Sequence, residues 1–160
     1  MGTKAEALAK QFEAKAQEAA AVLEKVSDAD WKKVTEAEKW SVGVTAHHVA
    51  GSHEPIAGMI QTIATGGKLP EGFTMDALHQ MNAKHAQEHA NCTKAETIAL
   101  HKKGAAAATA VVRGLSDEQL AKTGTLLGGM PPMSVEQVVT GILINHIDDH
   151  FGSIRKTVGA

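Results

Sequence analysis

Hydrophobic residues recur along this chain at steps of three and four positions, which is the spacing of amphipathic α-helices. Near the N-terminus, for example, Leu8 and Phe12 begin an apolar stripe that avoids Lys10. A further helical segment begins near Thr74 and pauses near Asn91. The spacing predicts four long helices, over about residues 4–26, 42–65, 94–113 and 135–158.

Local signals mark where these helices begin and end. Ser41 is a typical N-cap residue, and Gly114 stands where a C′ glycine would end the third long helix. Pro55 falls inside the second long helix and predicts a kink, because proline lacks the backbone N–H. Capping boxes, in which Ser or Thr precedes Glu or Gln by three positions, predict further helix starts at Thr93, Ser116 and Ser134.

The remaining segments are predicted to be connections. Residues 27–40 are expected to wrap over the surface with a short helical turn at 28–32, and Ser116 opens a short helix to about residue 122. Glycine and proline mark loops after residue 65 and over 123–133. The chain has 160 residues and no linker-like stretch, so a single domain is expected over residues 1–160.

Composition agrees with an all-α fold and excludes several function classes. Hydrophobic residues make up 43% of the chain but aromatic residues only 3%, which is typical of closely packed helices. Sixteen basic residues against 18 acidic ones, without a basic block, argue against a nucleic-acid partner. No apolar run approaches the roughly 18 residues that span a membrane, so a cytoplasmic protein is expected. The single cysteine, Cys92, excludes an intrachain disulfide and is expected to be a small buried residue.

Nine histidines stand out, and the sharpest pattern among them is His146-x-x-x-His150. On a helix, both rings leave the same face. A turn of 100° per residue places that face with Leu143 and Ile147, toward the interior. Two buried imidazoles need partners. Either a shared metal ion or hydrogen bonds to backbone or water would provide them.

A third metal ligand would have to come from the helix over 42–65, which carries three histidines. His47 falls on the polar face of that helix with Glu54, so we expect it at the surface. His48 and His53 lie at opposite edges of the apolar stripe. The spacing alone does not choose between these two.

The other histidines are expected to face solvent. His85 and His89 share the i, i+4 spacing, but their neighbours form a mixed strip that is typical of a solvated face. His79 and His101 stand alone and are expected at the surface. The chain contains no G-x-S-x-G, Walker A, G-x-G-x-x-G or H-E-x-x-H motif, so no organic cofactor is expected.

Two motifs resemble the DinB-like (DinB/YfiT) superfamily. Trp40-Ser41, with His48 eight positions after the tryptophan, is similar to the opening of that family's second helix. The stretch from His146 to Ile154 resembles its last-helix pattern H-x-x-x-H-x-G-x-I, and Leu115–Leu120 leads into a similar loop. Two positions depart from the pattern, since many members carry Arg where this chain has Phe151 and Gln where it has Ser153.

The resemblance implies an antiparallel four-helix bundle with a long crossover connection, commonly a homodimer. It implies one divalent metal ion, zinc or nickel, held by His48, His146 and His150, and so favours His48 over His53. Characterised relatives include S-transferases that use mycothiol or bacillithiol, and a mycothiol-dependent isomerase. The family name carries no implication of DNA binding.

Three histidines would leave an open position on the metal, which is typical of a catalytic site. The leading hypothesis is an enzyme that activates a low-molecular-weight thiol for transfer to an electrophile. A metal-dependent hydrolase and a non-catalytic module that binds a metal or small ligand are the alternatives. No catalytic residue is assigned, although Glu54, Asn82 and Asn145 are of a suitable type.

Overall fold

A computed structural model describes residues 2–70 and 72–159, and most of it is helical, as predicted. The long helical segments are α1 (Thr3–Lys25), α3 (Val42–Ala64), α5 (Lys94–Arg113) and a last segment made of α7 (Val135–Val138), η1 (Val139–Ile144) and α8 (Asn145–Val158). The shorter elements are α2 (Asp28–Trp31), α4 (Met75–Glu88), α6 (Asp117–Ala121), β1 (Thr123–Gly124) and β2 (Met133–Ser134). None of the helices in the described ranges is long and apolar enough to cross a membrane.

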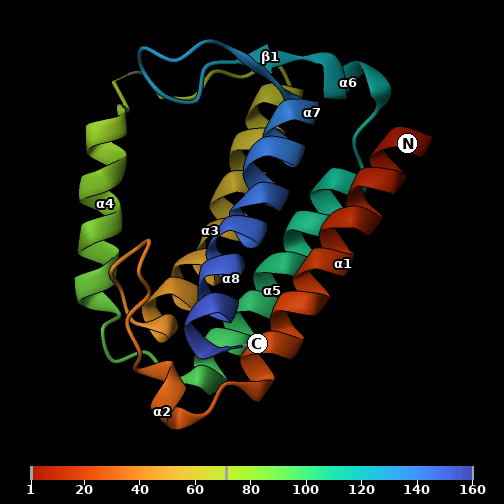
Figure 1. Cartoon of the computed structure of the whole chain (residues 1–160). Coiled ribbons are helices and arrows are strands. Elements are labelled where there is room, and N and C mark those ends of the chain that lie inside the picture. Colours follow the sequence, from red (N-terminus) through yellow and green to blue (C-terminus); the bar gives the residue numbers. More distant parts are fainter. Residues whose placement is uncertain (1, 71, 160) are drawn as a thin grey trace.

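The four long segments form a bundle (Figure 1). α1 and the last segment run in one direction, whereas α3 and α5 run in the other. α3 and α5 pack against each other although they run in the same direction, so the chain between them must return along the whole bundle. α4 makes this return on the outside, which confirms the predicted bundle with a long crossover.

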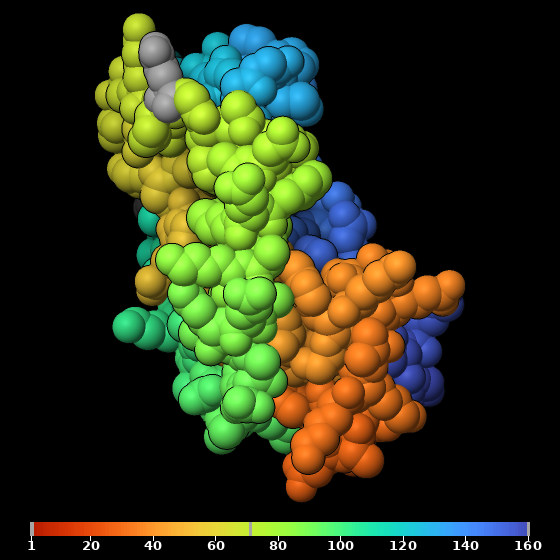
Figure 2. Space-filling view, turned by 90° about the vertical axis from the view of Figure 1, so that its left-hand side faces the viewer, coloured from red at the N-terminus to blue at the C-terminus, as the bar shows by residue number. Residues whose placement is uncertain are grey.

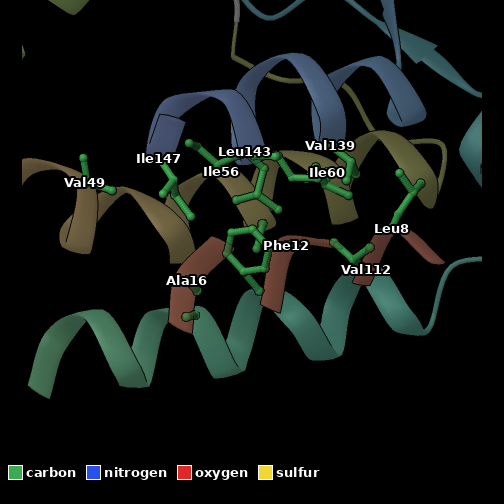
Figure 3. Packing of buried hydrophobic residues seen from close by; sticks show 14 of the residues in the cluster. Leu8, Phe12, Ala16, Val49, Ile56, Ile60, Val112, Val139, Leu143 and Ile147 are labelled. Carbon is green, nitrogen blue, oxygen red and sulfur yellow. The ribbon is translucent and has the colours of Figure 1, made fainter. Parts of the chain in front are cut away.

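Each long segment contributes apolar side chains to one interior (Figure 3). Phe12 of α1, Ile60 of α3, Val112 of α5 and Leu143 of η1 are all fully buried. Burial of one such side chain stabilises the fold by roughly 1.5–3 kcal/mol. At Gly104 an added Cβ would lie 3.2 Å from the Ala50 carbonyl oxygen, so the missing side chain lets α5 approach α3 closely.

The predicted capping signals are present. The Ser41 hydroxyl accepts a hydrogen bond from the Val44 N–H, and all three capping boxes form at the start of α5, α6 and α7. The prediction for Gly114 was wrong in its geometry, because this residue ends α5 as the C-cap with a right-handed φ of −79°. α3 continues through Pro55, and the kink predicted there stays a prediction.

Two local features differ from the predicted elements. The last helix, predicted as one regular α-helix over 135–158, contains the π-helical stretch η1, which ends two residues before His146. The hydrophobic spacing does not distinguish one widened turn from a regular one, and such turns are frequent at functional sites. The predicted loop 123–133 also begins and ends in a short antiparallel ribbon, in which β1 pairs with β2.

Candidate metal centre

The side chains of His48, His146 and His150 meet between α3 and α8. One nitrogen of each ring lies within 4.8 Å of the others, and His48 Nε2 is 3.1 Å from His146 Nε2. The ring planes meet at 68°, 87° and 89°, so their lone pairs can converge. A tetrahedral zinc site with bonds of 2.0–2.1 Å spaces its ligand nitrogens by about 3.3 Å. The donor set and its spacing therefore fit one metal ion.

Helix geometry explains how the chain assembles this group. His146 and His150 are one turn apart on α8, and α8 packs against the half of α3 that carries His48. The structure brings His48 to this pair, whereas His53 pairs with His101. His48 rather than His53 lies beside the pair because of which edge of α3 faces α8.

Glu38 supports His150 from the loop that precedes α3. Its Oε2 accepts a hydrogen bond of 2.7 Å from His150 Nδ1, and its Oε1 accepts one of 2.6 Å from the Ser153 hydroxyl. With Nδ1 protonated, His150 Nε2 keeps its lone pair for a metal ion. No local sequence signal points to Glu38, because it lies in a polar loop 112 positions before His150. Ser153, which departs from the family pattern, helps to hold this carboxylate.

Ser52 fixes His146 in the same way. The Ser52 hydroxyl donates its only hydrogen to the Val49 carbonyl, at 2.7 Å, and therefore accepts from His146 Nδ1 at 3.0 Å. His146 then carries its proton on Nδ1 and presents an unprotonated Nε2. Both histidines of α8 are thus held in the tautomer that a metal ligand requires.

Burial keeps His48 and His146 neutral. Burial, with the neighbouring imidazoles, lowers the pKa of His48 to about 3, and burial lowers the pKa of His146 to about 3. Burial alone would raise the pKa of Glu38, but the hydrogen bonds from Ser153 and His150 outweigh it and lower that pKa. An ionised carboxylate therefore faces His150 Nδ1.

Glu38→Gln is expected to weaken zinc binding by roughly 10–100-fold, the usual effect of removing a carboxylate behind a metal-ligating histidine. The amide keeps the size of the side chain but removes the negative charge beside His150. Competition titration against a chelating indicator measures the change. Glu36→Gln, in the same loop but with an exposed side chain, is the matched control and is expected to bind like the wild type. Equal affinities of the two variants would contradict a supporting role for Glu38.

The prediction that His47 lies at the surface is wrong. It was expected on a solvated face, but it is only 8% exposed, and its Nδ1 lies 2.9 Å from His85 Nε2. Its ring also stacks on His89. The expected solvated face is wrong for His85 and His89 as well, since both are half-buried. The physical reason is α4, which covers this end of the polar face of α3 and leaves Glu54 exposed.

The prediction that His101 lies at the surface is also wrong, because its side chain is only 1% exposed. Its Nε2 donates to the Ala16 carbonyl at 2.8 Å, so its Nδ1 accepts from His53 Nε2 at 3.0 Å. The pair spans the contact between α5 and α3. The predictions for the exposed His79 and the buried Cys92 are confirmed.

The three polar residues whose type suits a catalytic role, Glu54, Asn82 and Asn145, differ in their exposure to solvent. Glu54 and Asn145 are exposed, and the Asn145 amide donates to Asp149 at 3.2 Å. Asn82 on α4 is half-buried. A cavity of about 780 Å³ adjoins the contact between Glu38 and Ser153, yet it is lined from the outer side of α8 and the loop before α3, not by the three histidines.

Comparison with known proteins identifies the family of this chain and shows structures with the same fold. A family model described as the DinB superfamily matches residues 11–154, and no curated protein matches the chain in sequence. YfiT from Bacillus subtilis, described as a probable metal-dependent hydrolase with an unusual four-helix bundle topology, superposes with a TM-score of 0.78 at 16% identity, over 98% of this chain and 87% of that one. Two structures of the mycothiol-dependent maleylpyruvate isomerase, one a mutant, give TM-scores of 0.73 and 0.71 at 14% and 15% identity, over 99% of this chain and 69% of theirs.

Proposed function

This chain belongs to the DinB superfamily, and from that membership we propose that His48, His146 and His150 hold one divalent metal ion that serves thiol chemistry. The observation that carries the proposal is the convergence of three imidazoles, two of them held through Nδ1 so that Nε2 faces the other rings. Imidazole nitrogens suit zinc or nickel, whereas magnesium and calcium prefer oxygen ligands.

The bound ion would supply positive charge that favours deprotonation of a coordinated thiol or water. Three imidazole ligands bring no negative charge to compensate it. They therefore favour an anionic further ligand, and a thiolate meets that need better than a neutral thiol. Glu38 and Ser52 keep the rings of α8 in place while that ligand exchanges.

Thiol transfer to an electrophile is the reaction that we favour. It is supported by the isomerase of the same fold, which is described as mycothiol-dependent. A metal-dependent hydrolase is the second candidate, since YfiT is described as a probable one. A non-catalytic metal-binding module is the remaining alternative. The homodimer and the cytoplasmic location stay predictions.

Titration of the zinc-loaded protein with mycothiol or bacillithiol is expected to release about one proton per thiol bound, because the thiol binds as a thiolate. Isothermal calorimetry at pH 6 and pH 8, in buffers of different ionisation enthalpy, measures this release. S-methylated thiols, which have no proton to lose, are the matched ligands and are expected to bind weakly. Binding without proton release, or equal binding by the metal-free protein, would contradict the thiol mechanism and favour the hydrolase or the binding module.

A further inference from the structure

A second group of three histidines lies beside the first, where α4 packs against α3. His47 of α3 meets His85 and His89 from the end of α4, and one nitrogen of each ring lies within 4.8 Å of the others. The two groups are adjacent, since His47 and His48 are consecutive and the His48 ring centroid is 5.7 Å from that of His85. We propose that His47, His85 and His89 form a second site for a divalent transition-metal ion, which fastens the end of α4 to α3.

The chemistry of the three side chains supports this site. His47 Nδ1 and His85 Nε2 lie 2.9 Å apart, close to the roughly 3.3 Å between ligand nitrogens in a tetrahedral zinc site. His85 Nδ1 is buried and has no hydrogen-bond partner among the described residues. A set of imidazoles alone selects ions such as zinc, nickel or copper.

A metal ion at this site would stabilise the packing of α4 against the bundle. None of the fourteen residues of α4, all of them described, is fully buried, and the helix lies along the outer face of the molecule (Figure 2). A helix of this length needs tertiary contacts to be stable in water. The histidine cluster joins the end of α4 to α3, so a metal ion there would hold the crossover against the bundle.

Binding requires one ring to turn. The rings of His47 and His89 stack at 4.1 Å with only 21° between their planes, and the lone pairs of near-parallel rings do not converge. His89 is the C-cap of α4, where the backbone has already left the helix, with φ −113° and ψ 21°. Among the described residues no carboxylate hydrogen-bonds to these three rings, unlike His150. We therefore expect this site to be roughly 10–100-fold weaker than the first.

Titration of the metal-free protein with Zn²⁺ against a chelating indicator tests the inference. The wild type is expected to bind two ions in two steps. His89→Ala is expected to keep only the tight step and His146→Ala only the weak one, whereas His79→Ala, exposed on the same helix, keeps both. The inference uses none of the three ligands of the proposed function, so the two variants separate failure of one site from failure of the other.

Hydrogen exchange of the α4 amides provides a second measurement. The second equivalent of Zn²⁺ is expected to slow exchange near the end of Met75–Glu88 by at least tenfold in the wild type but not in His89→Ala. If His89→Ala fails to fold, His89→Gln keeps a polar side chain of similar size and is expected to lose the weak step. One ion per wild-type chain at saturation, or a weak step that persists in both His89→Gln and His85→Asn, would overturn the inference.

Discussion

His150→Ala is expected to abolish tight metal binding, with desalted protein retaining less than a tenth of the metal of the wild type. The substitution removes one of three converging nitrogens and leaves Glu38 without its imidazole partner. Removing a residue that only supports a ligand costs roughly 10–100-fold in metal affinity, so removing the ligand itself costs more. Elemental analysis after gentle purification measures the effect.

His79→Ala is the matched control for this experiment. His79 is exposed on α4, and its replacement is expected to leave the metal content unchanged and to alter stability by no more than about 0.5 kcal/mol. Circular dichroism of each variant checks that the helices remain. Full occupancy in a folded His150→Ala would refute the assignment of His48, His146 and His150 as ligands.

The metal-free protein is expected to lose about 6 kcal/mol of unfolding free energy between pH 7 and pH 5. Burial lowers the pKa values of His48, His53 and His146 to about 3 in the folded chain. The unfolded chain, with pKa values near 6.5, takes up protons that the folded chain excludes. The contribution of these histidines to the unfolding free energy is therefore fully present above about pH 6.5 and decreases as the pH drops toward 3. At pH 5 the loss is about 2 kcal/mol per histidine.

Urea unfolding of the metal-free protein at several pH values measures this loss, which is large beside a typical stability of 5–15 kcal/mol. Saturating zinc is expected to restore stability at pH 5, since it binds the folded chain through neutral imidazoles. His79→Gln, at an exposed position, is expected to show the same pH dependence as the wild type. Unfolding free energies within 1 kcal/mol of each other at pH 5 and pH 7 would show that these histidines are not buried as neutral groups.

The sequence by itself determined the helices and the orientation of the HxxxH pair. α1, α3 and α5 begin and end within a residue of the predicted bounds, because apolar spacing and capping are local properties of a chain. His146 and His150 share an inner face of α8 for the same reason. The single domain over residues 1–160 stays a prediction, and the metal identity follows from no pattern in the chain.

Tertiary structure alone decided what surrounds each histidine. Residue spacing describes one helix at a time, so it could not show that α4 covers His47, or that His101 lies between α1 and α3. It could not find Glu38, because a carboxylate becomes a partner of His150 only when a loop and a distant helix meet. Burial and hydrogen bonding belong to contacts between elements, and these contacts set the pKa values, the tautomers and the set of neighbouring imidazoles.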